Sequence, residues 1–385
     1  MKILMTGLLP EGSQQANGGV VAVIQNLLEA FSRIDGFEVC HLSFNKEISA
    51  PITRQIAPNI RLRFIPFKTK FDPADYLINR KVLNRILEEE QPDLIHIQEI
   101  TPQLLRFLHL DLRRIVVTQH GIMREELRNA KTLQSILKAF FKTLVERLIF
   151  PIFPNIIFIS DYNRKVFQGK PLQSTHIPNP VNRIFFDNPG QYGDSHKILF
   201  VAALSRIKNP ELLLSAISSL KDEGINYTLH IAGGFKNRRY EKFIHKLIQK
   251  LNIQNQIHFH GWQSRQQILE LHSLCALYVL SSRQETLPVA VAEAMATGRV
   301  VIASDVGAVS EMIEDKVTGF LYPRGDLEKL VQRLRFLHEN PAVINIISAK
   351  ALKKAHECYH PDQIAAATID FYEKVIQYRT EPVST

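Results

Sequence analysis

The sequence predicts an α/β protein of two domains, each built on a parallel sheet with helices on both faces. Strand-like apolar runs alternate with helix-like segments along the chain, which is the pattern of such sheets. The length of 385 residues exceeds one ordinary hydrophobic core and suits two. Between Val181 and His196 the composition changes to Asn, Pro, Gly and Asp, which is typical of a linker.

Four segments follow from these observations. A Rossmann-like domain is predicted over residues 1–181, a linker over 182–196 and a second Rossmann-like domain over 197–360. The final segment, 361–385, is predicted to be a helix that crosses back to the first domain.

The first domain opens with a strand, a glycine-containing loop and a helix that begins near Gly18-Gly19-Val20. This order starts a dinucleotide type of fold, but the glycines lack the GxGxxG spacing, so NAD is not implied. The expected elements are strands Lys2–Thr6, Phe37–Ser43 and Ile60–Pro66, helix Ala74–Glu90, strand Leu94–Gln98, helix Thr101–Leu110, strand Ile115–Gln119, and strand Ile156–Ser160 with a short helix after it.

Residues 131–150 form an amphipathic pattern, with apolar residues at helical spacing against lysine and arginine. The apolar positions are Leu133, Ile136, Leu137, Phe140, Leu144 and Leu148. Two interpretations stay open: a surface helix that turns this face to the core, or a helix that lies on a membrane surface. A second basic cluster could also contact lipid headgroups; it consists of Arg61, Arg63, Lys68 and Lys70, interleaved with Phe64, Phe67 and Phe71.

The second domain repeats the alternation. Its expected elements are strand Lys197–Ala203, helix Pro210–Leu220, strands Tyr227–Ala232, Gln256–His260 and Leu277–Leu280, helix Pro288–Thr297, strands Val300–Ala303 and Gly319–Tyr322, and two or three helices after them. Pro288 suits the first helical position, where its missing N–H is not needed. Gly298 suits a left-handed cap at the end of the same helix.

One helix of the second domain carries the candidate site. Helix Pro288–Thr297 is apolar on every side except for Glu293, so it is predicted to be buried, with hydrogen-bond donors around that carboxylate. A second carboxylate, Glu285, lies in the turn before the helix, whose free N–H groups and positive dipole end suit a phosphate. Carboxylates for sugar hydroxyls beside a phosphate-binding helix end predict a nucleotide-sugar site. The alternative is that Glu293 is a structural residue bonded to neighbouring backbone.

Composition narrows the class of partner. Net charge is +9, and residues 1–180 hold 23 basic and 17 acidic residues, which favours an anionic membrane surface or a phosphorylated acceptor. No recognised nucleic-acid module is present, so nucleic acid is not expected. Three widely separated cysteines argue against a disulfide framework or a zinc site and favour a reducing cytoplasm. No apolar run approaches the roughly 18 residues of a membrane-spanning helix.

The spacing Glu285-x7-Glu293, followed by Ala294-Met295-Ala296-x-Gly298 and by Gly307…Glu311, resembles the signature of glycosyltransferase family 4. The resemblance implies a retaining, metal-independent enzyme of GT-B architecture, with two Rossmann-like domains whose parallel sheets face each other across a donor and acceptor cleft.

The resemblance also implies roles for residues of the second domain. Glu293 would hold the donor ribose, Glu285 would face the donor sugar, and the amides near Leu287, Pro288 and Val289 would lie by the phosphates. Lys208 matches a lysine that clamps the diphosphate. The arginine expected beside that lysine is replaced by Ala203, so Arg206 is the candidate substitute.

In the first domain, Gly18 and Gly19 match a family Gly-Gly-Val whose amides face the donor phosphate or the acceptor. His120, in Thr118-Gln119-His120-Gly121, matches a histidine beside the reacting sugar. His120 also follows a predicted strand, and open α/β sheets bind ligands at the carboxyl ends of their strands.

We therefore predict a retaining hexosyltransferase-type glycosyltransferase that moves a sugar from a nucleoside diphosphate to a glycan, lipid-linked oligosaccharide or polyol in cell-surface polysaccharide biosynthesis. Its expected catalytic residues are His120, Lys208 and Glu285. No cofactor and no metal are expected, since no Asp-x-Asp occurs and cationic side chains with helix ends must hold the diphosphate. The expected location is cytoplasmic, peripheral on the inner face of the plasma membrane. The alternatives are another GT-B enzyme, such as a nucleotide-sugar epimerase, or a non-catalytic GT-B-shaped subunit of a transferase complex.

Overall fold

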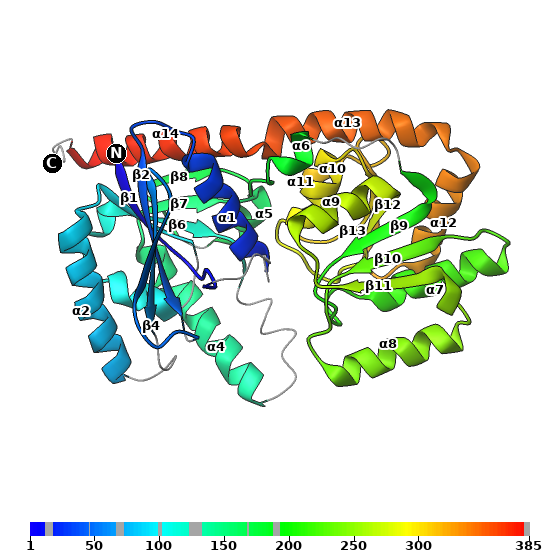
Figure 1. Ribbon diagram of the computed structural model, residues 1–385, viewed down its shortest axis with the longest axis horizontal. Coiled ribbons are helices and arrows are strands. Elements are labelled where there is room, and N and C mark those ends of the chain that lie inside the picture. The colour runs from blue at the N-terminus through cyan, green and yellow to red at the C-terminus, as the bar shows by residue number, and fades with distance from the viewer. Residues whose placement is uncertain are drawn as a thin grey trace. The chain divides into compact units, whose positions relative to one another are not determined.

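The computed structural model describes residues 1–11, 18–45, 47–66, 73–98, 102–122, 133–167, 169–187 and 193–380. The chain divides into two compact units (Figure 1). Unit 1 consists of the described residues of Met1–Ser13, Gly19–Asn179 and Pro361–Thr385, and unit 2 of those of Gln14–Gly18 and Pro180–His360. The last helix is therefore part of unit 1.

Unit 1 contains an eight-stranded sheet with the strand order β3-β4-β2-β1-β5-β6-β7-β8. The pairs are parallel except β3 with β4, which is antiparallel. The strands are β1 Lys2–Thr6, β2 Glu38–Asn45, β3 Ile52–Ala57, β4 Ile60–Pro66, β5 Leu94–Ile97, β6 Ile115–Gln119, β7 Asn155–Phe158 and β8 Gln173–His176.

The helices of unit 1 cover both faces of this sheet. They are α1 Gly19–Phe31, α2 Pro73–Glu90, α4 Leu133–Leu148, α5 Asp161–Val166 and α14 Pro361–Thr380, with 3₁₀ segments η1 Pro102–Phe107, η2 Leu112–Arg114 and η3 Phe150–Ile152. Helices α1 and α14 pack against each other (Figure 1). Helices α2 and α4 contribute instead to a core cluster with Leu4, Ile95 and Val117 of the sheet.

One predicted element of unit 1 is wrong, two strands were missed, and part of one cluster lies outside the described residues. The expected helix Thr101–Leu110 is the 3₁₀ segment η1, and Thr101 lies outside the described residues. Strands β3 and β8 were not predicted, because both are largely exposed edge strands without an alternating apolar pattern. Of the second basic cluster, Lys68, Lys70, Phe67 and Phe71 also lie outside the described residues.

Helix α4 turns its apolar stripe away from the core. Ile136, Leu137, Phe140, Phe141, Leu144 and Leu148 are 37–60% exposed. Contact with the core is made instead by Ala139 and Val145, each 4% exposed. The core-facing interpretation of this stripe is wrong, because helical spacing identifies an apolar face without showing what covers it.

Unit 2 contains a six-stranded sheet with the order β11-β10-β9-β12-β13-β14, all neighbours parallel. The strands are β9 Asp194–Val201, β10 Thr228–Ala232, β11 Ile257–Gly261, β12 Cys275–Leu280, β13 Val300–Asp305 and β14 Phe320–Pro323. The chain enters at β9, builds outward to β11, and then continues on the other side of β9 with β12. The loops after β9 and β12 therefore meet at the carboxyl edge, which is where open α/β sheets bind ligands.

The helices of unit 2 are α6 Ile184–Asp187, α7 Pro210–Asp222, α8 Arg238–Lys250, α9 Arg265–Leu274, α10 Val289–Ala296, α11 Val309–Met312, α12 Leu327–Glu339 and α13 Ala342–Tyr359, with the 3₁₀ segment η4 Gln254–Gln256. Helices α7, α8 and α12 share one core cluster with the sheet. Both α6 and the start of β9 fall within the predicted linker 182–196. The prediction of two parallel-sheet, Rossmann-like domains is confirmed.

A buried cation fixes the end of α10. Gly298 has φ +72°, as predicted for a left-handed cap, and its N–H donates to the carbonyl of Met295 at 3.0 Å. The next residue, Arg299, is 1% exposed, and its guanidinium donates to the carbonyls of Thr297, at 2.6 and 2.9 Å, and Cys275, at 3.3 Å. A cation at a helix C-terminus also opposes the negative end of the helix dipole. Helix α10 is thus anchored at the end farthest from the candidate site.

Candidate active site

An ion pair lies at the carboxyl edge of the unit 2 sheet. Lys208, from the loop after β9, places Nζ 2.5 Å from Oε1 of Glu285, from the loop after β12. The Ser282 hydroxyl donates to the same carboxylate oxygen at 2.6 Å. The Glu285 side chain is 9% exposed and that of Lys208 is 29% exposed. The fold has thus brought together two predicted site residues that are 77 positions apart.

The two loops are tied to each other through their backbones. The Ser281 hydroxyl donates to the carbonyls of Lys208 and Asn209 at 3.1 and 2.9 Å, and the Arg283 N–H donates to the Ile207 carbonyl at 2.7 Å. Asn209 is buried with φ +51°, a left-handed conformation that asparagine tolerates better than most residues. These contacts fix the main chain on both sides of the ion pair.

A third loop packs against the backbone of Glu285. Gly307 has φ +60°, and a Cβ atom added to it would lie 1.8 Å from the Glu285 carbonyl oxygen. The neighbouring Ala308 N–H donates to the Thr286 carbonyl at 3.1 Å. The glycine at this position, which the sequence offered only as part of a family signature, is therefore required by close approach and by backbone conformation.

The helix beside the ion pair differs from its prediction in two respects. Pro288 is the N-cap residue, with φ −71° and ψ 112°, so α10 begins at Val289 rather than at the proline. The helix is also not buried all round, since Val289, Ala290 and Glu293 remain partly exposed. Their spacing places them on one side of the first turns of α10. Glu293 therefore lies on the same side of α10 as the partly exposed residues of the first turn. The N–H groups of that turn lack partners within the helix.

Glu293 lacks the donors expected around it. Among the described residues its carboxylate makes no hydrogen bond, so the alternative of a structural glutamate bonded to neighbouring backbone is not supported. Close packing raises the pKa of Glu293 to about 7, with a smaller opposing effect of Arg265. Burial without hydrogen-bond donors therefore favours the protonated form of the Glu293 carboxyl group.

Arg206, the predicted substitute for the arginine missing at Ala203, points toward α8 instead. Arg206 is exposed, and its guanidinium lies over the rings of Tyr240 and Phe243 on α8, at 5.8 and 5.5 Å. The sequence analysis missed Arg283, whose guanidinium donates to the side-chain oxygen of Asn209, the residue after Lys208, at 2.9 Å. The only sequence signal for Arg283 was its place in the polar turn that also carries Glu285.

The candidate residues of unit 1 occupy the equivalent edge of their own sheet. His120 follows β6, and its Nε2 lies 2.7 Å from Oε1 of Gln98, which follows β5. Burial lowers the pKa of His120 to about 4, so the imidazole is neutral at pH 7. Gly19 begins α1, and Gly18, which precedes it, is grouped with unit 2; both are exposed, and a Cβ added to either would meet no atom within 4 Å. Gln98 was not predicted, although it ends a predicted strand beside His120.

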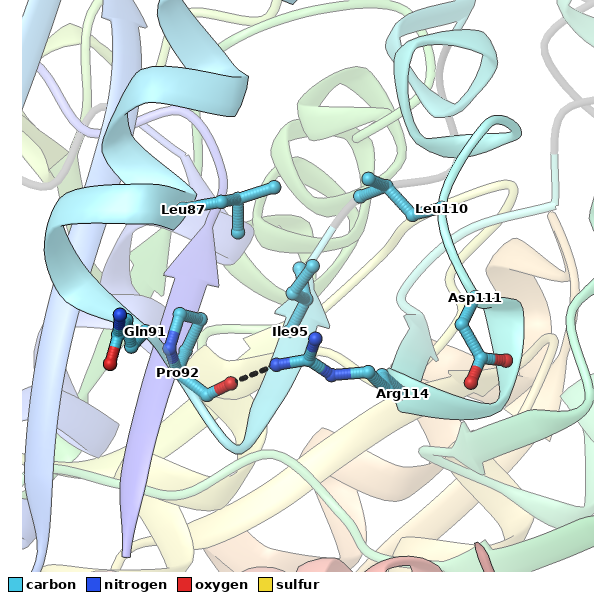
Figure 2. A pocket seen from close by; sticks show the side chains of 7 residues that line it. All are labelled: Leu87, Gln91, Pro92, Ile95, Leu110, Asp111 and Arg114. Atoms are coloured by element: carbon cyan, nitrogen blue, oxygen red, sulfur yellow. Dashed lines mark hydrogen bonds between the residues drawn. The ribbon is translucent and has the colours of Figure 1, made fainter.

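A pocket of unit 1 lies away from this edge (Figure 2). Its lining residues are Leu87, Gln91, Pro92, Ile95, Leu110, Asp111 and Arg114. Arg114 donates to the Pro92 carbonyl across the pocket (Figure 2). Pro92 precedes β5 and Arg114 precedes β6, so the pocket lies at the amino ends of the strands. It is therefore not part of the candidate site, which follows the carboxyl ends.

Two further observations on the described residues concern metal binding and membrane crossing. Within them, no group of three or more His, Cys, Asp or Glu side chains is arranged to hold a metal ion. No helix among them is both long enough and apolar enough to cross a bilayer.

Two family profiles match this chain. The profile of glycosyltransferase family 4 matches residues 17–183, and that of glycosyl transferases group 1 matches residues 181–357. An uncharacterised glycosyltransferase of Methanocaldococcus jannaschii is 27% identical over 88% of this chain and 90% of its own length. The D-inositol 3-phosphate glycosyltransferase of Streptomyces avermitilis is 28% identical, over 46% of this chain and 40% of its own.

Solved structures share the fold. Sucrose-phosphate synthase from Thermosynechococcus elongatus aligns with a TM-score of 0.81 at 18% identity, over 98% of this chain and 99% of that one. Anabaena HepE in complex with UDP and glucose aligns with a TM-score of 0.73 at 19% identity, over 97% and 99%. The two profiles adjoin along nearly the whole chain and each corresponds to one Rossmann-like unit, so this protein belongs to glycosyltransferase family 4 and is a glycosyltransferase of GT-B fold.

Proposed function

We propose that the protein transfers a sugar, with retention of configuration and without a metal ion, from a nucleoside diphosphate to a hydroxyl acceptor. The carrying observation is the Lys208–Glu285 pair at the edge of the unit 2 sheet, held by loops that follow adjacent strands. HepE, which shares the fold, has been solved with UDP-glucose, and this supports a nucleotide sugar as the donor.

The charges of unit 2 suit the parts of such a donor. Lys208 follows β9 and α10 follows β12 at the same edge of the sheet, and together they would hold the diphosphate. Glu285 is already oriented by Lys208 and Ser282, and its second oxygen would accept hydrogen bonds from sugar hydroxyls. Glu293 offers a carboxyl group without a protein partner, which suits the two ribose hydroxyls. The main-chain amides of Leu287 and Val289 complete the proposed phosphate contacts around Pro288.

The proposed reaction needs no protein nucleophile. The bond from the sugar anomeric carbon to the diphosphate oxygen breaks, and the acceptor oxygen forms the new glycosidic bond on the same face. The acceptor proton passes to the leaving phosphate. Catalysis then consists of positioning the reactants and stabilising the charge that builds up on the diphosphate. A neutral His120 contributes a hydrogen bond to the sugar or the acceptor rather than a positive charge.

The acceptor we propose is a glycan, a polyol or a lipid-linked oligosaccharide of the cell surface, reached by peripheral binding to an anionic membrane on the cytoplasmic side. Helix α4 supports the last of these proposals, because its exposed apolar stripe lies beside Lys142 and the exposed Arg147. Apolar burial together with attraction to anionic headgroups is how interfacial helices bind.

A thermal-shift experiment tests donor binding. UDP, GDP and their common sugars should be titrated against the wild type, since a ligand of the native state raises its Tm. One nucleotide should raise Tm in the wild type and in a Lys353→Ala control, in which an exposed lysine of unit 2 is lost, but far less in Lys208→Ala. No shift with any nucleotide would contradict the proposal. With the nucleotide identified, activity abolished by EDTA and restored by Mg²⁺ would contradict metal independence, and free sugar without a glycoside product would favour an epimerase.

Vesicle sedimentation tests the membrane part. The wild type should sediment with vesicles of anionic lipid at low salt and be released by salt, which screens the attraction. The double variant Leu137→Glu with Phe140→Glu should stay in the supernatant, while Ile346→Glu, at an equally exposed apolar position of α13, should behave as the wild type. Equal sedimentation with neutral and anionic vesicles would contradict an electrostatic contribution.

A further inference from the structure

A chain of buried polar side chains runs through unit 1 from α14 to His120. The Tyr372 hydroxyl lies 2.5 Å from Nδ1 of His96, and Nε2 of His96 lies 2.7 Å from the Thr118 hydroxyl. The Gln98 amide nitrogen lies 3.3 Å from the His96 ring, and its oxygen lies 2.7 Å from Nε2 of His120. Tyr372, His96, Thr118 and Gln98 are each 0–4% exposed. Burying a polar group costs stability unless the group is hydrogen-bonded. The question is therefore which residue this chain of hydrogen bonds holds in place.

The contacts of Gln98 set the direction of its amide. Its nitrogen faces the His96 ring and lies 3.8 Å from the Met5 sulfur, which can only accept a hydrogen bond. The oxygen of the same amide therefore faces His120 and must accept a hydrogen bond from it. A neutral imidazole carries one N–H, so that proton is on Nε2 of His120 and the lone pair is on Nδ1.

The second ring nitrogen of His120, Nδ1, is available to a ligand. Burial lowers the pKa of His120 to about 4, with a smaller opposing effect of the Asn179 side chain, so the ring stays neutral at pH 7. Within the described part of the chain, Nδ1 of His120 has no hydrogen-bond partner. A lone pair on that atom suits a hydroxyl donor, which is the group that a sugar or an acceptor presents.

The next layer holds Gln98 itself. Both ring nitrogens of His96 are engaged, by Tyr372 on one side and Thr118 on the other, and the His96 and Tyr372 rings meet edge to face at 5.5 Å. Tyr372 comes from the last helix, 276 positions from His96. The C-terminal helix thus completes the support of a residue at the ligand edge of the sheet.

We propose that Gln98 is a positioning residue that fixes His120 as the Nε2–H tautomer, and that Tyr372, through His96, fixes Gln98. His120 then offers Nδ1 as a hydrogen-bond acceptor for a substrate hydroxyl. This role in catalysis depends on the proposed transfer reaction, but the tautomer of His120 does not.

The first test is made without substrate. In protein labelled with ¹⁵N-histidine, NMR should show His120 as the Nε2–H tautomer at pH 7, with its signal assigned by its loss in His120→Asn. Gln98→Leu should abolish that preference, whereas Gln98→Glu keeps an acceptor oxygen and should restore it while raising the pKa of His120. An Nδ1–H tautomer in the wild type, or an unchanged tautomer in Gln98→Leu, would overturn the proposal.

The second test uses the transferase reaction. Gln98→Leu should lower kcat by roughly tenfold to a hundredfold, the scale expected when a site residue is misplaced. The KM for the donor should not change, because the proposed donor contacts are in unit 2. Tyr372→Phe should lower kcat by a smaller factor, and Tyr378→Phe, on the exposed side of the same helix, should not lower it. If Gln98→Leu fails to fold, Tyr372→Phe and the wild-type spectrum decide. Absence of activity in the wild type would contradict the proposed function, and the spectra would still decide the tautomer.

Discussion

The carboxyl edges of the two sheets have similar topology, but the candidate side chains are charged in unit 2 and uncharged in unit 1. In unit 2 the edge carries a formally charged pair, Lys208 and Glu285, which keeps partial contact with solvent. In unit 1 the edge carries a histidine held neutral by burial, supported by an uncharged glutamine. A diphosphate is held by cations and main-chain amides, and a neutral imidazole can accept a hydrogen bond from a hydroxyl group. The contrast is the one expected if the proposed donor site is in unit 2 and the proposed hydroxyl-binding group is His120 of unit 1.

The strongest way to break this contrast is to neutralise the charged pair. Glu285→Gln keeps the shape of the side chain but removes the charge that orients Lys208, and we expect kcat/KM to fall by about 10²–10³. The matched control is Glu357→Gln, which removes the acidic partner of an exposed pair with Lys353 in the same unit and should leave activity unchanged. Equal activity in Glu285→Gln and the control would remove the pair from the site.

A second variant disturbs the same carboxylate through its backbone. Gly307→Ala places a Cβ 1.8 Å from the Glu285 carbonyl, so the loop must move, whereas Gly325→Ala carries a similar φ of +76° with no atom within 4 Å. The control should lose roughly 1–2 kcal/mol from its left-handed conformation alone. Gly307→Ala should lose distinctly more in urea unfolding and should also lose donor affinity. Identical unfolding curves for the two variants would show that the loop relaxes without cost.

Much of this arrangement could be predicted from the sequence, and the failures at the candidate site share one cause. The bounds of β1, β4 and β6 are those predicted, because apolar runs and turn residues are local signals. Lys208 and Glu285 were both named as site residues, with roles taken from the family resemblance, but the ion pair between them was not predicted. The partners of Gln98, the solvent-facing stripe of α4 and the missing donors around Glu293 depend on packing between distant segments. No spacing along the chain encodes those contacts.

A third prediction uses the pKa of Glu293. Because its folded value of about 7 exceeds the unfolded value near 4.5, the folded protein binds more protons between these values, and stability falls as pH rises through that window. Glu293→Gln removes this titration, so the variant should match the wild type near pH 4.5 and exceed it by roughly 1–3 kcal/mol at pH 8, partial exposure limiting the gain. Donor use should fall, because the charged form of the acceptor is lost.

Chemical unfolding and turnover should be measured on one preparation of Glu293→Gln across this pH range. A stability difference that does not change with pH would show that Glu293 titrates normally in the folded protein. A folded variant with full activity would remove Glu293 from the donor site.

The smallest expected effect belongs to Arg206, the proposed substitute for the arginine missing at Ala203. A charge-assisted contact with phosphate is worth roughly 1.5–3 kcal/mol. To reach the phosphates, however, the guanidinium must leave the rings of Tyr240 and Phe243, at a cost of roughly 0.5–1 kcal/mol for an exposed cation–π contact. Arg206→Ala should therefore weaken nucleoside diphosphate binding by about 1 kcal/mol, which is roughly a fivefold rise in Kd by calorimetry. Arg283→Ala provides the comparison, since the Arg283 guanidinium contacts Asn209 and Glu211 rather than an aromatic ring. If Arg206→Ala leaves the Kd unchanged and Arg283→Ala raises it, the second cation of the site is Arg283, and the loss of arginine at position 203 is compensated from the loop after β12.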